Sequence, residues 1–238
     1  MANFPSSRSP HSALSAPSRR TFLHTAAVAG GGLLIGFAMP SGMKRLAAQE
    51  PGAKKGLPKA NAFVRIAPDG TITVSISHSE MGQGIWTTLP MLLNEELGAD
   101  WSRFKVEHAP AGADYAHTAF GMQMTGGSST TWSEFDRYRQ VGAIARTLLV
   151  AAAAKRWGVA PESCRVEKGV VIHGEKKLAF GELATEAAAL PPPAEVKLKD
   201  KKAWTLIGKP VKRLDTPEKS NGKAVFGLDI KLPGLLTA

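Results

Sequence analysis

The feature that most limits where a folded domain can begin is an arginine pair near the start of the chain, Arg19-Arg20. A short apolar run over residues 25–39 follows it, broken by three consecutive glycines and too short for a membrane-spanning helix. An arginine pair before such a run is typical of the bacterial twin-arginine export signal, which carries proteins that are already folded. We therefore assign residues 1–48 to an export leader, and we expect any cofactor to be loaded in the cytoplasm.

The charge of the leader supports this assignment. Its basic residues are Arg8, Arg19, Arg20, Lys44 and Arg45, and it contains no Asp or Glu. The alternative is a chance arginine pair on an amphipathic or membrane-anchoring helix. A purely basic segment is expected of a signal and not of a folded domain, so we favour the signal and expect the twin-arginine translocase as a partner.

The sequence defines the cleavage point of the leader less well. The best small-residue exit is near Ala47-Ala48, but Arg45 and Leu46 make a poor cleavage motif. The alternative is therefore an uncleaved form that stays tethered to the membrane. We expect the protein in the periplasm, or anchored to the periplasmic side of the inner membrane if the leader is retained.

Composition beyond the leader argues against a nucleic-acid partner. Removing five of the 30 basic residues leaves 25 against 20 acidic ones, a net charge of about +5 in place of +10. The remaining lysines are scattered except for a run over residues 197–202, which follows a triple proline and resembles a solvated linker. The sequence contains no DNA- or RNA-binding motif, so no nucleic acid is expected.

The single cysteine, Cys164, restricts both the stabilisation and the redox chemistry of the chain. It cannot form an internal disulfide, so the fold must rest on its hydrophobic core. One thiolate also cannot hold an iron–sulfur cluster, which needs several. Any electron carrier of that kind must therefore belong to a partner chain.

Periodicity predicts the elements of the first half of the domain. A turn at residues 67–70 joins two alternating segments, 63–66 and 71–77, into a β-hairpin. Apolar residues at helical spacing predict a helix over 85–97 that ends at Gly98, with Pro90 in its first turn or at a kink. A short strand is expected over residues 104–108.

The second half begins with a longer helix. Thr131 and Glu134 have the spacing of a capping box, which predicts the start of this helix, and Gly158 predicts its end. Strands are then expected over 164–167 and 170–173 and a short helix over 181–190. The order of elements predicts an α+β fold with helices packed on a mixed sheet and no strict βαβ repeat.

Composition also divides the chain into segments. We expect a linker at 49–60, a main segment at 61–190, a proline- and lysine-rich linker at 191–203 and a new segment at 204–238.

Two glycine-rich segments are the candidate chemical sites. Residues 80–84 contain Gly82, Gln83 and Gly84 between a strand and a helix, and residues 125–131 precede the longer helix. Glycines let the backbone approach a ligand closely, and amides at a helix N-terminus favour anionic oxygens such as phosphate. The two segments are predicted to hold one phosphate-bearing ligand between them, the alternative being two tight strand-to-helix turns. Neither has the spacing of a P-loop or a dinucleotide fingerprint.

Other residues carry weaker functional signals. His78 stands beside the first glycine segment, where it could face a ligand, although a solvated or packed histidine is the commoner outcome. Met122 and Met124 could pack under a cofactor or fill gaps in the core. For Ser128 and Ser129 the sequence shows no histidine partner that would allow nucleophilic catalysis. The histidines are too scattered along the chain to predict a metal site.

The first glycine segment resembles a known family. Residues 80–87, with 89–92 and 95–97 after them, look like the molybdenum cofactor-binding segment of xanthine dehydrogenase and aldehyde oxidase relatives, particularly the isoquinoline 1-oxidoreductase type. Residues 125–129 match the family's second glycine-serine loop. Motifs over 207–236 resemble the opening of its α/β hammerhead domain, which places 204–238 at the start of that domain.

The resemblance implies a molybdenum–pterin cofactor in its cytosine dinucleotide form, held by the complete subunit. Gln83 would hydrogen-bond an oxygen on the metal, and a group of loop residues would line the pterin and phosphate. That group consists of Gly82, Gly84, Gly126, Gly127, Ser128 and Ser129. Glu80 would support the loop and would not act as a base.

The resemblance also implies a reaction and its partners. The reaction is hydroxylation of an aldehyde or N-heterocycle with oxygen from water. Electrons would leave through a small subunit with two 2Fe–2S clusters, with a membrane acceptor such as a cytochrome as a further partner. The family's catalytic glutamate lies far downstream, so we expect the N-terminal part of a large subunit, inactive alone. The alternative is a noncatalytic exported remnant that binds a ligand or partner.

Overall fold

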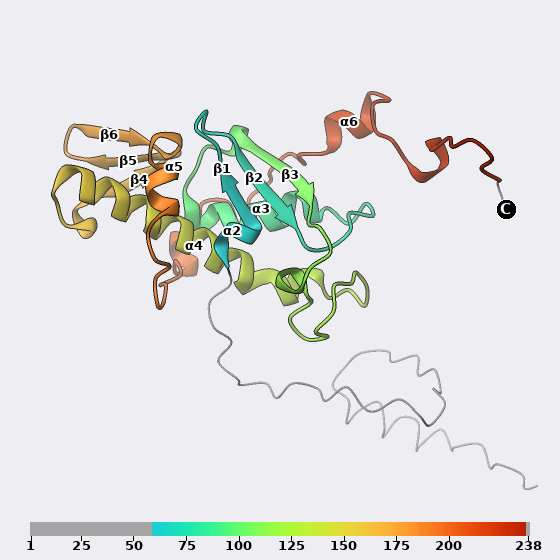
Figure 1. The fold of residues 1–238 in the computed structure, drawn as a ribbon, viewed down its shortest axis with the longest axis horizontal. Coiled ribbons are helices and arrows are strands. Elements are labelled where there is room, and N and C mark those ends of the chain that lie inside the picture. The colour runs from blue at the N-terminus through green and yellow to red at the C-terminus, as the bar shows by residue number, and fades with distance from the viewer. Residues whose placement is uncertain (1–58, 237–238) are drawn as a thin grey trace, which may run out of the picture. The chain divides into compact units, whose positions relative to one another are not determined.

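A computed structural model describes residues 59–236 (Figure 1). Arg19, Arg20 and the rest of the predicted leader lie outside the described residues, as does most of the linker at 49–60. The helices are α2 Ala60–Phe63, α3 Ile85–Leu97, α4 Thr130–Trp157, α5 Phe180–Ala188 and α6 Thr216–Ser220. The strands are β1 Val64–Ile66, β2 Ile72–Ile76, β3 Phe104–His108, β4 Arg165–Glu167, β5 Val170–His173 and β6 Lys176–Ala179.

The first sheet confirms the predicted hairpin and the predicted mixed character. β1 pairs antiparallel with β2, and β2 pairs parallel with β3 in the order β1-β2-β3. α3 connects the two parallel strands, so β2, α3 and β3 form one βαβ unit. Figure 1 shows this sheet lying against α3 and α4. The carboxyl ends of β2 and β3 therefore lie together at one edge of the sheet.

The second sheet is a separate antiparallel meander, β4-β5-β6. β4 and β5 were predicted, but β6 was not. Three of its four residues are exposed, so the strand shows almost no apolar alternation. The mixture of helices with small sheets agrees with the predicted α+β fold.

Two glycines end the two main helices as predicted. Gly98 has φ +77° and donates its N–H to the Asn94 carbonyl at 2.9 Å, and Gly158 has φ +67°. A residue with a side chain rarely adopts this left-handed conformation, so glycine is favoured at both helix ends. Pro90 lies inside α3 and removes one N–H from the helical ladder.

The predicted capping box at Thr131 and Glu134 is wrong. α4 begins one residue earlier, at Thr130, and Ser129 occupies the N-cap position without a side-chain cap bond. The Ser129 hydroxyl instead donates to the Gly126 carbonyl at 2.6 Å. Glu134 is fully buried in the helix. The first-turn N–H groups of α4 consequently have no serine or threonine cap.

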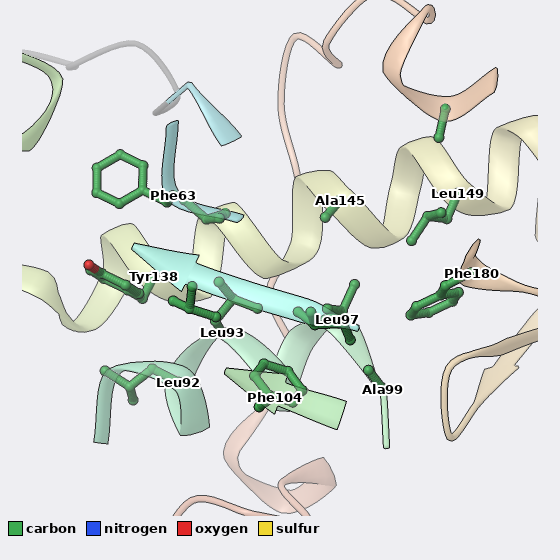
Figure 2. Packing of buried hydrophobic residues seen from close by; sticks show 14 of the residues in the cluster. Phe63, Leu92, Leu93, Leu97, Ala99, Phe104, Tyr138, Ala145, Leu149 and Phe180 are labelled. Carbon is green, nitrogen blue, oxygen red and sulfur yellow. The ribbon is translucent and has the colours of Figure 1, made fainter. Parts of the chain in front are cut away.

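The hydrophobic core lies between the first sheet and the pair α3 and α4. Figure 2 shows Leu93 and Leu97 of α3 near β2, with Tyr138 and Ala145 of α4 beside them. Tyr138 is fully buried, and its hydroxyl donates to the Ser75 carbonyl at 2.8 Å and accepts the Ser77 N–H at 3.1 Å. This residue fixes the end of β2 against α4, because its only polar atom is satisfied by the strand.

Residues beyond the second sheet return to α3 and α4. Glu95 is fully buried and accepts the backbone N–H groups of Thr205, Leu206 and Ile207 at 2.9, 2.7 and 2.9 Å. Glu96, also fully buried, accepts from Arg139 at 2.7 Å.

The lysine run was expected to be solvated, but Lys199 is an exception. Its backbone N–H donates to Glu96 at 3.0 Å, and its ammonium donates to the Glu95 carbonyl. Residues 191–236 contain no strand, and their assignment to a linker and a hammerhead opening stays a prediction. Among residues 59–236, no helix combines the length and apolarity needed to cross a membrane.

Close approach of α3 and α4 requires a glycine at position 142. A Cβ atom added to Gly142 would lie 2.0 Å from the Leu93 carbonyl oxygen and 3.2 Å from Glu96 Cβ. Glycine inside a helix costs about 1 kcal/mol relative to alanine. An alanine at position 142 would overlap with backbone atoms, and no side-chain rotation can relieve that overlap. Its cost therefore exceeds the gain in helix propensity.

We predict that Gly142→Ala lowers the free energy of unfolding by about 2 kcal/mol or more, despite its gain in helix propensity. Chemical denaturation of the full chain measures the effect. Gly227→Ala is the control, because a Cβ there meets no atom within 4 Å. A Gly142→Ala protein as stable as the unchanged chain would contradict the close contact.

Candidate functional site

The first loop, residues 79–84, is organised by the carboxylate of Glu80. Glu80 Oε1 accepts the N–H groups of Gly82 at 2.7 Å and Gly84 at 3.1 Å, and Oε2 accepts that of Trp86 at 3.0 Å. Burial opposes the charged form, but these N–H donors and nearby Lys219 together hold the pKa of Glu80 below its ordinary value. The predicted supporting role of Glu80 is confirmed.

This capping corrects one expectation about the first loop. Gly84 is the N-cap of α3 with φ +90°, so the helix N-terminus begins inside the glycine segment. Its amides were expected to favour a phosphate, yet Glu80 already occupies the N–H groups of Gly84 and Trp86. A negatively charged ligand is therefore disfavoured at this helix end.

Gln83 is exposed but partly engaged within the first loop. Its Oε1 accepts the Met81 N–H at 2.5 Å, and its Nε2 donates to the Ser79 carbonyl at 2.8 Å. A primary amide has two donor hydrogens and two acceptor lone pairs. Within residues 59–236, one donor hydrogen and one lone pair of Gln83 have no partner, and the two internal bonds fix the direction in which they point.

The second loop, residues 125–129, leads into α4. Gly127 has φ +62°, and Ser128 has φ +52°, an uncommon conformation for a residue with a side chain. Such strain occurs frequently at functional sites. Ser128 is exposed, so its hydroxyl and the uncapped first turn of α4 are available to a ligand.

The two loops meet directly. The Ser79 N–H donates to Thr125 Oγ1 at 2.7 Å. Met81, Gln83 and Ile85 line one wall of a cavity of about 430 Å³, and residues 125–131 line the other. None of these described lining residues is charged. This is the shared cavity.

The predicted site residues fall on two sides of the first loop. Gln83, Gly126, Gly127, Ser128 and Ser129 line the shared cavity. Gly82 and Gly84 instead lie toward Arg213, whose Nη1 donates to the Gly82 carbonyl at 3.1 Å. The structure therefore brings five of the seven predicted residues to one cavity.

Ser129 has a histidine neighbour that the sequence did not reveal. His117 Nε2 lies 2.9 Å from Ser129 Oγ, and the Ala119 N–H donates to His117 Nδ1 at 3.0 Å. Because Nδ1 accepts, the neutral ring carries its proton on Nε2 and donates it to Ser129. The Ser129 proton goes to the Gly126 carbonyl. The pair therefore stabilises the loop and does not activate a nucleophile, which requires the histidine to accept.

A second cavity of about 430 Å³ lies at the carboxyl ends of β2 and β3, and shares Met81 and Thr125 with the first. His78 lines it and is nearly fully buried. His78 Nδ1 lies 3.0 Å from Ser77 Oγ, and its Nε2 has no hydrogen-bond partner within residues 59–236. Burial lowers the pKa of His78 to about 4, with smaller contributions from the positive charge of Arg137 and from that of His117 when its ring is protonated.

Other candidates have structural surroundings. Met122 is exposed, whereas Met124 lines the second cavity. The described part of the chain holds no cluster of three or more His, Cys, Asp or Glu able to bind a metal ion.

The chain matches a family model for the molybdopterin cofactor-binding domain over residues 12–230. It belongs to that family. The family resemblance inferred from the sequence is thus confirmed.

Curated relatives cover the same region. The chain is 36% identical over 230 residues to a membrane-bound aldehyde dehydrogenase of Gluconacetobacter polyoxogenes, whose name includes pyrroloquinoline quinone; the match spans 92% of this chain and 28% of the relative. It is 37% identical over 216 residues to the beta chain of isoquinoline 1-oxidoreductase from Brevundimonas diminuta, over 75% of this chain and 28% of the relative. One of the subunits of nicotinate dehydrogenase from Pseudomonas putida is 30% identical, over 73% of this chain and 14% of the relative. The chain thus spans less than a third of each relative's length.

Two solved structures match part of the chain, and each of them is several times longer than the matched region. Quinoline 2-oxidoreductase from Pseudomonas putida 86 matches with a TM-score of 0.38 at 21% identity, over 57% of this chain and 17% of that one. CO dehydrogenase from Oligotropha carboxidovorans matches with a TM-score of 0.43 at 21% identity, over 56% of this chain and 17% of that one.

The shared cavity fits a molybdopterin ligand by the chemistry of its donors. Phosphate oxygens need N–H and hydroxyl donors, which the uncapped start of α4 and Ser128 provide. Gln83 adds a neutral amide for a further oxygen. The family's cofactor is therefore compatible with the residues of this cavity.

We predict that His78 makes stability depend on pH in a defined window. Its pKa falls from 6.5 in the unfolded chain to about 4 in the fold, so the unfolded state binds more protons between these values. The stabilisation is complete above about pH 6.5 and falls as the pH drops toward about 4. Between about pH 7 and pH 5, the free energy of unfolding of the His78→Gln protein should therefore fall by about 2 kcal/mol less than that of the unchanged chain.

Urea denaturation of both proteins at the two pH values measures this difference. Carboxylates with lowered pKa values, such as Glu80, lose their contribution at lower pH and affect both proteins equally. An identical pH dependence in the two proteins would show that His78 does not titrate as described.

Proposed function

We propose that this chain is the N-terminal, cofactor-binding part of the large subunit of an exported molybdenum hydroxylase. The observation that carries the proposal is the meeting of Gln83 and the second loop at one uncharged cavity in a member of the molybdopterin cofactor-binding domain family. The cofactor is proposed in its cytosine dinucleotide form. When bound in the complete subunit, it supplies a two-electron oxidation of an aldehyde or N-heterocycle, with the oxygen taken from water.

In this proposal the residues of this chain bind and orient the cofactor. Amides and hydroxyls of the second loop hold phosphate oxygens, where the positive end of the α4 dipole favours negative charge. Gln83 would donate its second N–H to an oxygen of the bound cofactor. Glu80 holds the first loop, and its engagement with three N–H groups leaves it unsuited to act as a base. In line with the family resemblance, we place the catalytic glutamate in a later part of the complete subunit.

Partners and location follow from the same proposal. A small subunit with two 2Fe–2S clusters takes up the electrons, with a membrane acceptor such as a cytochrome beyond it. The names of the relatives support aldehydes and N-heterocycles as substrate classes. The mature protein is placed in the periplasm, or on the periplasmic side of the inner membrane. The alternative function is an exported, noncatalytic module that binds a ligand or partner.

A second candidate cofactor is pyrroloquinoline quinone, which the name of the Gluconacetobacter polyoxogenes relative contains. Its carboxylates are also anionic and could meet the same donors. The two candidates differ in composition, because only the pterin cofactor brings molybdenum and phosphate. Elemental analysis of the purified protein therefore separates them.

We predict that Gly127→Ala prevents retention of the cofactor. Gly127→Ala and the control Gly158→Ala introduce the same kind of backbone strain, since their φ values are +62° and +67° and neither added Cβ meets an atom within 4 Å. Each should cost about 1 kcal/mol of stability. Only Gly127 lines the shared cavity, where a methyl group would stand in the path of a closely bound ligand.

The measurement is the molybdenum and phosphorus content per molecule of the complete large subunit, expressed in a host that makes the cofactor. We expect both elements in the unchanged complete subunit and in its Gly158→Ala variant, and neither element in its Gly127→Ala variant. Equal contents in the two variants would place the cofactor elsewhere. A bound quinone without molybdenum would favour the second candidate.

We also predict that replacing Arg19 and Arg20 with lysines blocks export. The twin-arginine route depends on the arginine pair, so the variant should accumulate in the cytoplasm. Fractionation of the native host, with detection by an antibody against residues 60–190, measures the distribution. Undiminished delivery to the periplasm would remove the export claim.

A further inference from the structure

Three charged residues far along the chain hold the first loop from outside. They are Arg213, Asp215 and Lys219, called here the clasp. Arg213 Nη1 donates to the Gly82 carbonyl at 3.1 Å, and its Nη2 lies 3.4 Å from Glu80 Oε1. These contacts join residues that are more than 130 positions apart. The clasp therefore touches both the backbone of the loop and the carboxylate that organises it.

Asp215 fixes the position of Arg213. Its Oδ1 accepts Arg213 Nε at 3.0 Å, and its Oδ2 accepts Nη2 at 2.9 Å, a two-pronged contact that orients the planar guanidinium. Arg213 lowers the pKa of Asp215 to about 2, against the effect of burial and with help from Lys219. The Leu214 N–H also donates to Thr87 Oγ1 at 3.0 Å, which attaches this segment to α3.

The charges of the site balance only when the clasp is in place. The side chains of Glu80 and Asp215 are 3% and 1% exposed, and Arg213 and Lys219 are 38% and 33% exposed. Lys219 lies 3.9 Å from Glu80 and also contacts Asp215. Two buried carboxylates thus face two cations, and loss of one cation leaves a buried negative charge without compensation.

We infer that Arg213, oriented by Asp215, is a positioning residue for the first loop and fixes the conformation in which Gln83 faces the shared cavity. The inference rests on the proposed function, because that proposal assigns the first loop to the cofactor site. The loop is complete only when residues 213–219 are docked on α3. Cofactor binding would therefore depend on correct folding of a segment that follows the main domain in the sequence.

Hydrogen–deuterium exchange of the full chain without cofactor tests the clasp. The probes are the amides of Gly82, Gly84 and Trp86, which Glu80 accepts. In Arg213→Ala their exchange should accelerate by about tenfold or more, as expected for loss of charge-assisted hydrogen bonds. Core amides of β2 should be unchanged.

Arg156→Ala is the matched control. Arg156 is 37% exposed and pairs with Glu186 at 2.5 Å, away from the loop. It should leave exchange of the loop amides unchanged. Unchanged loop exchange in a folded Arg213→Ala protein would overturn the inference. If that variant does not fold, Arg213→Lys replaces it and should give a smaller acceleration, because it keeps the charge and loses the two-pronged contact.

Two further readouts separate positioning from general stability. Glu80→Gln should reduce the additional effect of Arg213→Ala on loop exchange, because the two residues act on the same loop; purely additive effects would overturn the coupling. In the complete subunit, expressed in a cofactor-producing host, Arg213→Ala should lower molybdenum content relative to Arg156→Ala. Faster loop exchange with undiminished molybdenum content would overturn the positioning role. Absence of molybdenum from the unchanged complete subunit as well would count against the proposed function instead.

Discussion

The contact between α3 and α4 at Gly142 is the constraint on which the candidate site depends. Each glycine-rich loop leads directly into one of these helices, so the spacing of the helices sets the spacing of the loops. Only a residue without a side chain permits the Leu93 carbonyl to approach position 142 so closely. Helix packing distances depend on the side chains at the contact, and a glycine gives the smallest. The shared cavity is therefore a consequence of a buried contact that has no chemical role of its own.

Buried carboxylates form the second element of this construction. Glu80, Glu95 and Glu96 each accept backbone N–H groups from a different segment of the chain. For Glu95, burial raises the pKa, but the N–H donors of Ile207, Thr205 and Leu206 outweigh it and hold the pKa below its usual value. Buried charges of this kind add little net stability, because desolvation offsets the attraction. Their effect here is positional, since each carboxylate ties one segment to α3.

Local signals in the sequence predicted the elements well. The turn with Pro68 and Gly70 and the helix end at Gly98 were confirmed, because each depends on the backbone preferences of one or two residues. The capping box failed because α4 begins at Thr130, which places Thr131 inside the first turn and not at the N-cap. The Ser129 hydroxyl at the N-cap position donates instead to the Gly126 carbonyl. β6 was missed because its exposed residues carry no hydrophobic alternation.

The candidate site was predictable in outline and not in detail. Glycine and serine content identified both loops, and five of the predicted residues line one cavity. Capping of α3 by Glu80, the His117–Ser129 contact and the Arg213 clasp depend on tertiary contacts, for which a single sequence has no local signal. These contacts decide which loop is open to an anion. Sequence alone treated the two loops as equivalent. In the structure Glu80 caps the start of α3, whereas the N-cap residue of α4 makes no side-chain cap bond.

The most direct test of the account is a crystal structure of the complete large subunit purified from cofactor-producing cells, with diffraction data collected at the molybdenum absorption edge. The account predicts phosphate density at Gly126, Gly127 and Ser128 and a molybdenum peak within reach of the Gln83 amide. Both belong to one ligand in the shared cavity. Ligand density in another cavity, such as that between α4 and β4 near Cys164, with the two loops empty, would contradict it.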